Sequence, residues 1–385
     1  MSVYLDNAAT SFPKPEKVYQ AVIHAMREVG ASPGRGGHHR SLEAGRIMFM
    51  AREAVARLFS IPDSSRIIFT HNATGALNLA LHGTLKPGDH VITTSMEHNS
   101  LLRPLHALGR EGVDVTIVDA GPDGLVDPER IARVVRKDTR MIAVGHISNV
   151  CGAIQPIAQV SAICRKAGAM FLVDAAQSAG YIDIDAVSSG IDLLAAPGHK
   201  GLLGPPGTGL LYVAPHVELK PIFEGGTGTS STSLEQPLMM PDGYEAGTHN
   251  LPGIAGLKAG IEFILERGID TILQHERALV NQAATQLALI PGVKIYGPGD
   301  PDRRGAVLSF NVEGVDASLL AAELDYGFDI AVRAGLHCAP LAHRTIGTLP
   351  GGTLRMSPGW SSTSEEIAFF SDAVVQCIGK IKESM

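Results

Sequence analysis

Two charged residues of opposite sign stand where short apolar segments end. Asp174 follows the apolar run 169–173, and Lys200 lies in PGHKG (197–201), just after the apolar run 193–195. A buried carboxylate is costly without a cation or donors, although Asp174 by itself could equally cap a helix. A lysine framed by glycines at a strand end points into the cleft where α/β sheets bind ligands. Together the two residues indicate a pyridoxal 5'-phosphate (PLP) site, with a Schiff-base lysine and an aspartate that keeps the pyridine nitrogen protonated.

A phosphate-binding segment and a ring-stacking residue are expected beside this pair. FTHNATG (69–75) follows an apolar run and opens a helical pattern, so backbone N–H groups near Gly75 and the Thr74 hydroxyl could bind a phosphate. The alternative is that Thr74 simply caps the helix. His98, in SMEHN (95–99), follows the next apolar run, where an imidazole could stack on a flat ring.

One cysteine out of four is a candidate nucleophile. Cys338 lies in GLHCAP (335–340) between two strand-like runs, with His337 and Arg333 nearby. A thiol reacts as its thiolate, which adjacent cations favour. No CxxC pair is present, so neither a disulfide framework nor a metal site is expected. The remaining cysteines have apolar or helical neighbours and are expected to be buried and inert: Cys151, Cys164 and Cys377.

The elements that position these residues form an α/β pattern. Seven short apolar runs without polar alternation predict strands buried on both faces: 66–70, 90–94, 113–118, 141–145, 169–173, 193–195 and 209–213. Helical spacing between them, as in 127–137 and 156–166, predicts a mostly parallel seven-stranded sheet between helices. The last two runs are expected to form a hairpin. Their connection contains GPPGTG (204–209), which leads into a strand rather than a helix and therefore is not a nucleotide P-loop.

The length and a change in composition near residue 253 predict two domains. At about 150 residues per domain, 385 residues suggest a large and a small one. We expect a large PLP-binding domain at 15–252, and a smaller α+β domain made of 1–14 and 253–385 that carries the Cys338 loop. The latter shows long helical patterns over 254–290, several short strands, and a terminal helix from Ser364. The long polar loop 225–244 is expected to be functional or mobile.

Composition and charge exclude several classes of protein. Hydrophobic residues make up 45% and charged residues 18% of the chain, which argues against disorder. The net charge of −7 gives no basic footprint for nucleic acid. No apolar stretch approaches the roughly 18 residues of a membrane span. Residues 1–16 lack the features of a secretory signal, so a cytoplasmic location is expected.

Eight segments, spread in order over nearly the whole chain, are similar to those of cysteine desulfurases and selenocysteine lyases. These are class V aminotransferase-like enzymes of PLP fold type I. The segments are YLDNAAT (4–10), SMEHN (95–99), HISNVCG (146–152), VDAAQSAG (173–180), GHKGLLGPPGTGLLY (198–212), YEAGT (244–248), RAGLHCAP (333–340) and TLRMS (353–357).

The resemblance implies a role for each matching residue at the cofactor. Lys200 resembles the Schiff-base lysine, Asp174 the partner of the pyridine nitrogen, Gln177 the ligand of the ring hydroxyl, and His98 the imidazole stacked on the ring. The expected phosphate ligands are Thr74, Gly75, His199 and, supplied across a homodimer, Thr248. Pro197 is a departure, because relatives with this pattern often have a phosphate-binding serine there.

On the substrate side, the resemblance assigns Asn149, Arg333 and Arg355 to binding, with Arg355 holding the amino-acid carboxylate. Asn149 would also contact the cofactor. Cys338 aligns with the cysteine that accepts sulfur. The implied reaction is conversion of L-cysteine to L-alanine, with the sulfur held as a persulfide and passed to an acceptor protein.

Two alternatives stay open. Within the same fold, the chain could be a selenocysteine lyase acting on L-selenocysteine, or another PLP-dependent C–S lyase or aminotransferase. A different class is a non-catalytic sulfur-relay scaffold, but a scaffold needs none of Lys200, Asp174 and Cys338. No metal is expected in any of these.

Overall fold

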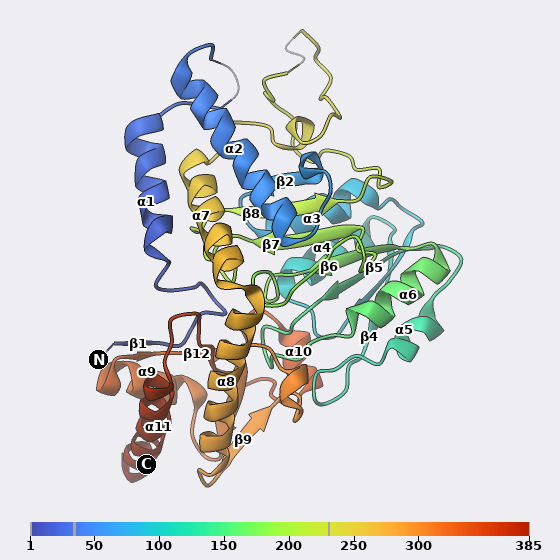
Figure 1. The fold of residues 1–385 in the computed structure, drawn as a ribbon. Helices are drawn as coiled ribbons and strands as arrows, with labels where there is room; N and C mark the ends of the chain where they lie inside the picture. Colours follow the sequence, from blue (N-terminus) through green and yellow to red (C-terminus); the bar gives the residue numbers. More distant parts are fainter. Residues whose placement is uncertain (1, 34–35, 230–231, 385) are drawn as a thin grey trace.

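The computed structural model describes residues 2–33, 36–229 and 232–384. Its centre is a seven-stranded sheet, seen among helices in Figure 1. The strand order is β2-β8-β7-β6-β5-β3-β4, and only β8 runs against its neighbours. The prediction of a mostly parallel sheet is therefore confirmed. Its strands are β2 (Ile67–Thr70), β3 (His90–Thr94), β4 (Asp114–Val118), β5 (Thr139–Gly145), β6 (Met170–Asp174), β7 (Leu193–Pro197) and β8 (Gly209–Val213).

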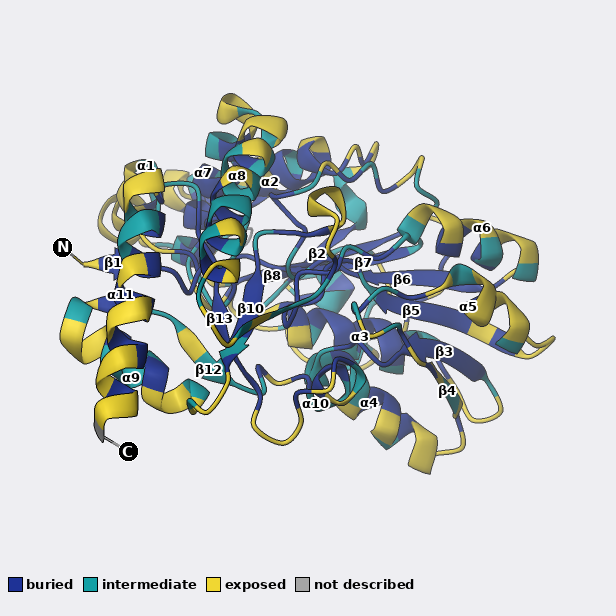
Figure 2. Ribbon diagram, turned by 90° about the horizontal axis from the view of Figure 1, so that it is seen from below, coloured by how far each residue is buried: buried dark blue, intermediate teal, exposed yellow. Residues whose placement is uncertain are grey.

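Helices cover this sheet, as the apolar strands require. Strands β3, β6, β7 and β8 are buried along their whole length (Figure 2). The expectation of burial on both faces is wrong for β4, which lies at the edge of the sheet and exposes Asp114 and Ile117. The helices of this part are α1 (Glu16–His24), α2 (His39–Leu58), α3 (Ala73–Thr84), α4 (Asn99–Arg110), α5 (Pro128–Val134), α6 (Ile157–Ala167) and α7 (Leu251–Arg267).

The expected hairpin between the last two strands is confirmed by the antiparallel pairing of β7 with β8. The loop that contains 204–209 leads directly into β8, as the rejection of a P-loop requires. Gly209 is needed at the start of β8, because a Cβ there would lie 2.6 Å from the backbone carbon of Asn72. The glycine thus lets the hairpin approach the start of α3.

A second unit is built on a four-stranded antiparallel sheet of order β12-β13-β10-β9. A two-stranded parallel sheet joins the N-terminus to it by pairing β1 with β11. The strands are β1 (Val3–Tyr4), β9 (Val293–Tyr296), β10 (Leu308–Val312), β11 (Ile330–Ala331), β12 (Arg333–Gly335) and β13 (Thr353–Met356). The remaining helices are α8 (Ile269–Ala288), α9 (Ala317–Phe328), α10 (Pro340–Thr345) and α11 (Ser364–Ser384). Of these, α10 packs through Ala342 on the core of the seven-stranded sheet.

Two hydrophobic clusters indicate where one unit ends and the other begins. Val3 and Leu5 lie in the smaller cluster, in keeping with a small domain that includes the N-terminal residues. Helix α7 packs on α1 and α2 and contributes to the larger cluster, together with Ile272 of α8. Leu279, further along α8, lies in the smaller cluster. We therefore propose that the boundary lies within α8 rather than at residue 253.

The long polar loop 225–244 runs irregularly over the surface until a short turn at Asp242–Tyr244. Residues 230 and 231 of this loop lie outside the described residues. Among the helices of the described ranges, none combines the length and hydropathy needed to cross a bilayer.

Candidate active site

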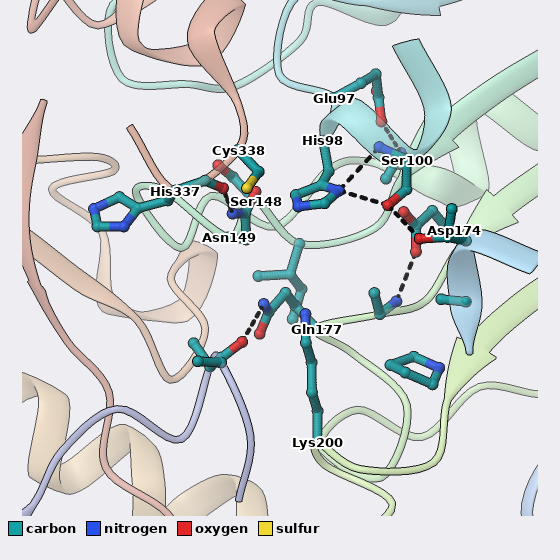
Figure 3. Close-up of a pocket in the computed structure, with 18 of the residues that line it drawn as sticks. Glu97, His98, Ser100, Ser148, Asn149, Asp174, Gln177, Lys200, His337 and Cys338 are labelled. Carbon is teal, nitrogen blue, oxygen red and sulfur yellow. Dashed lines mark hydrogen bonds between the residues drawn. The ribbon is translucent and has the colours of Figure 1, made fainter. Parts of the chain in front are cut away.

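The carboxyl ends of β2, β3, β5, β6 and β7 meet at a cavity of about 340 Å³ (Figure 3). Parallel strands bring their polar ends to one edge of a sheet, which is where open α/β folds bind ligands. The second unit closes the cavity with residues of β12, β13 and the loop between β12 and α10. Twelve of the residues singled out from the sequence line it: Thr74, His98, Asn149, Asp174, Gln177, Pro197, His199, Lys200, Arg333, His337, Cys338 and Arg355.

Asp174 is the last residue of β6 and is 7% exposed. Its Oδ1 accepts the N–H of Ala176 at 2.9 Å, and none of the described residues forms an ion pair with it. Burial raises the pKa of Asp174, whereas the Ala176 N–H and the nearby charge of Lys200 lower it. A buried carboxylate that lacks a bonded cation is suited to a positively charged N–H of a ligand.

Glu97, for which no role was predicted from the sequence, is a second buried carboxyl beside Asp174. Its oxygens accept the Thr94 hydroxyl at 2.5 Å and the Gly145 N–H at 2.8 Å. Burial raises the pKa of Glu97 to about 8, and the charge of Asp174 adds to this rise. Burial therefore favours a proton on Glu97 at neutral pH, and a neutral Glu97 adds no negative charge beside Asp174.

Replacing Glu97 by glutamine is expected to flatten the pH dependence of stability. The folded protein binds a proton at Glu97 that the unfolded chain releases above its ordinary pKa of 4.5, so wild-type stability falls as the pH rises toward 8. Below pH 4.5 this contribution is fully present. Relative to Glu97→Gln, wild type should lose up to about 1.4 kcal/mol per pH unit in that window. Urea unfolding at pH 5.5 and 7.5 measures the difference.

Exposed Glu129 on α5 provides the matched control, because Glu129→Gln removes a carboxylate that is already in water. This control should follow the pH dependence of wild type. Parallel stability profiles for wild type and Glu97→Gln would show that Glu97 is ionised in the folded protein.

His98 is fixed at the start of α4 by Ser100, a residue that was not predicted from the sequence. Its Nδ1 accepts the Ser100 N–H at 3.0 Å, which places the ring hydrogen on Nε2. The Ser100 hydroxyl lies 2.8 Å from the same Nδ1 and 2.9 Å from the Thr74 hydroxyl. Burial, followed by the charges of Lys200 and two arginines, lowers the pKa of His98 to about 4. The imidazole is therefore neutral at physiological pH.

The structure decides which residue caps α3. Asn72 is the cap, since its Oδ1 accepts the Gly75 N–H at 2.9 Å. The alternative reading of Thr74 as a cap is wrong; Thr74 lines the cavity, with its hydroxyl 2.9 Å from that of Ser100. Gly75 does not line the cavity, and its N–H is bonded to Asn72 Oδ1; its assignment as a phosphate ligand stays a prediction.

Lys200 reaches the cavity from a loop that the N-terminal segment braces. Ser11 donates its hydroxyl to the Lys200 carbonyl at 2.9 Å and its N–H to the His199 carbonyl at 3.0 Å. Gln177 donates to the Ala8 carbonyl at 3.0 Å. Burial lowers the pKa of Lys200 to about 8, while Asp174 opposes this shift. A neutral amine is thus accessible near physiological pH, as a base or nucleophile requires.

Cys338 lies in a strained turn that is anchored on both sides. His337 and Cys338 both adopt left-handed backbone conformations, with φ of 47° and 58°. The Asn149 side chain donates to the His337 carbonyl at 2.7 Å, and the Asn99 N–H donates to the Cys338 carbonyl at 2.8 Å. The Nδ2 group of Asn149 therefore holds the cysteine loop, while the exposed Cys338 lines the cavity.

The expectation that His337 supplies a cation beside Cys338 is wrong. The ring of His337 is buried, points away from Cys338 (Figure 3), and lies with Nε2 3.2 Å from the Thr353 hydroxyl. Burial lowers the pKa of His337 to about 2, so the ring stays neutral.

The other three cysteines are buried, as expected, and burial raises the pKa of Cys164 to about 12 and that of Cys377 to about 11.

Arg355 is 3% exposed and projects from β13 into the cavity. Its Nη1 donates to the Asn149 carbonyl at 2.9 Å and its Nη2 to Asp6 Oδ1 at 2.9 Å.

Thr248 does not reach this cavity. It lines a separate cavity of about 510 Å³ with residues of α2 and the loop after β8. The chain's own Thr248 therefore does not complete its own site.

These residues fit a bound PLP molecule. Lys200 offers a reactive amine, Asp174 an unpaired buried carboxylate, and His98 a flat neutral ring. The hydroxyls of Thr74 and Ser100, near the first turns of α3 and α4, lie where helix N-termini favour a phosphate. Gln177 and His199 also line the cavity and could contact the cofactor.

Comparisons with known proteins agree with this arrangement. The Aminotransferase class-V family model matches residues 3–370. A probable cysteine desulfurase of Methanothermobacter thermautotrophicus is 38% identical over 383 residues, covering 98% of this chain and 95% of that protein. A cysteine desulfurase of Salmonella agona is 34% identical over 346 residues, covering 87% of this chain and 84% of that protein. The apo structure of a cysteine desulfurase from Thermococcus onnurineus NA1 superposes with a TM-score of 0.93 at 32% identity, covering 98% and 95% of the two chains.

Proposed function

Because the chain belongs to the aminotransferase class-V family, we propose that it is a PLP-dependent cysteine desulfurase. It would convert L-cysteine to L-alanine and retain the sulfur as a persulfide on Cys338. The observation that carries the proposal is the exposed Cys338 in the same cavity as Lys200, Asp174 and Arg355. A nucleophilic sulfur, an amine base and a carboxylate-binding arginine are the groups that this reaction needs.

Four residues of the cavity have defined tasks in this reaction. When bound, PLP supplies an electron sink for the substrate carbon. Arg355 holds the substrate carboxylate, and Lys200 Nζ takes the α-proton. Asp174 would hold a proton on the ring nitrogen, since its buried carboxyl has no ion-pair partner among the described residues. Cys338 Sγ attacks the substrate sulfur: an S–S bond forms, the C–S bond breaks, and its electron pair stays on carbon, which is then protonated.

The test of this proposal is an assay with two substrates. We expect the PLP-loaded protein to release alanine from L-cysteine, with sulfide appearing once a thiol reductant cleaves the persulfide. Release of alanine from L-selenocysteine alone would instead favour the selenocysteine lyase. Release from neither would favour the scaffold.

We further propose a homodimer in which Thr248 reaches the partner's cavity. Phe49 and Phe223, which each line a cavity together with Thr248, are large apolar side chains that are exposed. An apolar surface of this kind is typical of an interface between subunits.

The protein would work in the cytoplasm, where free thiols such as those of its four cysteines persist, and would pass the sulfur to an acceptor protein.

Mixed dimers of two variants, each impaired at limiting PLP, are expected to recover activity. Thr248→Ala is expected to weaken PLP binding and Lys200→Ala to remove the base. In a hybrid dimer, one site then carries both changes and the other carries neither, so about half of wild-type activity per dimer returns. Activity at limiting PLP after co-refolding measures this. A mixture no more active than its parents, or a monomer by sedimentation, would contradict the shared site.

A further inference from the structure

Two arginines of the site stand directly opposite each other on neighbouring strands. Arg333 of β12 pairs in register with Arg355 of β13 in the antiparallel sheet. Like charges in that position repel one another, and the repulsion is stronger because the Arg355 side chain is only 3% exposed. The pair therefore needs a negative charge close by.

Asp6 provides that charge, although it lies 327 and 349 residues away along the chain. Its Oδ1 accepts Arg355 Nη2 at 2.9 Å, and its Oδ2 lies 3.0 Å from both Nε and Nη2 of Arg333. The side chain of Asp6 is 12% exposed, so the three charges share a partly desolvated site. Asp6 thus bridges the two arginines at the cavity wall.

The backbone around Asp6 is tied to the segment that carries Arg355. The Ser357 N–H donates to the Leu5 carbonyl at 2.7 Å, and the Asn7 N–H donates to the Ser357 carbonyl at 3.1 Å. The Asn7 side chain donates to the same carbonyl at 3.1 Å. These bonds hold Asp6 beside Ser357, which follows Arg355 by two residues, and so fix the direction of the guanidinium group.

The hydrogen bonds of Arg355 leave the Nε–H available for a ligand. Nη1 is bonded to the Asn149 carbonyl and Nη2 to Asp6, whereas the buried Nε–H has no partner among the described residues. A buried donor without a partner is costly unless a ligand satisfies it. Arg333 lines the same cavity with a side chain that is 51% exposed.

We propose that Asp6 is a positioning and specificity-determining residue that sets the carboxylate subsite at one net positive charge. One net positive charge, beside a buried Nε–H that no described residue satisfies, suits a substrate with a single carboxylate, such as an amino acid with a neutral thiol side chain. Without Asp6, the two unopposed arginines would favour a dicarboxylate. This inference rests on the proposed function, because it assigns the cluster to the substrate carboxylate.

A charge-compensation series tests the proposal. The holoenzymes of wild type, Asp6→Asn, Arg333→Gln and the double variant are titrated with propionate and with succinate at constant ionic strength. The rise in melting temperature gives both affinities without requiring activity. Asp6→Asn should shift the preference toward succinate by at least about tenfold, and the double variant should return it to within about threefold of wild type. Arg333→Gln should weaken the binding of both anions.

Asn7→Ala is the matched structural control, since it loosens the same segment without changing charge. It should lower the melting temperature but leave the succinate-to-propionate preference as in wild type. An unchanged preference in folded Asp6→Asn would overturn the proposal. If Asp6→Asn is recovered only as an unfolded protein, the double variant (Asp6→Asn with Arg333→Gln) takes its place. A succinate-to-propionate preference of that double variant that differs from the preference of wild type would overturn the proposal.

The outcome is separable from that of the proposed function. Wild-type protein that releases no alanine from L-cysteine, yet shows the expected shifts in anion preference, would refute the desulfurase and leave the charge assignment standing. A working desulfurase with an unchanged preference in Asp6→Asn would refute only the role of Asp6.

Discussion

Replacing Cys338 by alanine is expected to lower alanine formation from L-cysteine by at least about 100-fold, while much of the turnover of L-selenocysteine remains. The carbon–sulfur bond breaks poorly without a thiolate to take the sulfur, whereas selenium is a better leaving group. Cys338 is exposed on the cavity wall, and the other three cysteines are buried, so none of them can replace it. The measurement is alanine released from each substrate under saturating conditions.

Two further variants show whether the loss is chemical. Cys338→Ser keeps the size of the side chain and the turn, but a hydroxyl is a poor nucleophile. This variant should therefore lose as much activity with L-cysteine as Cys338→Ala does. Cys164→Ala removes a buried thiol of α6 and should keep the activity of wild type. Mass spectrometry of wild type quenched during turnover should find one additional sulfur on the Cys338 peptide. Desulfuration by Cys338→Ala would show that the persulfide mechanism is wrong and favour a simple β-eliminating lyase.

Replacing Lys200 by alanine is expected to reduce kcat by about 1000-fold or more, since it removes both the attachment point of PLP and the base. Burial has lowered the pKa of this amine to about 8, so its neutral form is accessible near physiological pH. Wild-type holoenzyme should be yellow, and borohydride reduction followed by peptide mapping should place the pyridoxyl group on Lys200. The variant should lack this label.

Lys14 is the matched control for this experiment. Burial lowers its pKa to about 8 too, and its Nζ donates to the His199 carbonyl at 2.8 Å, next to Lys200 in the chain. Lys14→Ala should retain the pyridoxyl label and most of the activity, because Lys14 does not line the cavity. A label on Lys14, or a folded protein that takes up no PLP, would refute the site assignment.

The strands and the edge at which their polar ends meet could be predicted from the sequence. Short apolar runs mark buried strands, and parallel strands direct the residues that follow them to a common edge. Asp174, Lys200 and His98 could therefore be assigned to one cleft from the order of residues alone. The terminal helix and the strands of the second unit follow from the same local periodicity.

Contacts between distant residues were decided by the tertiary structure. The bridge from Asp6 to Arg355 joins opposite ends of the chain. No short stretch of sequence therefore shows that the charges of these residues balance. The raised pKa of Glu97 comes from its depth of burial and then from the charge of Asp174, neither of which a short segment encodes. His337 stands beside Cys338 in sequence, but packing turns its ring into the core, where it stays neutral. Local sequence determines periodicity and backbone preference, whereas charge, protonation and shared contacts depend on which distant groups the completed fold brings together.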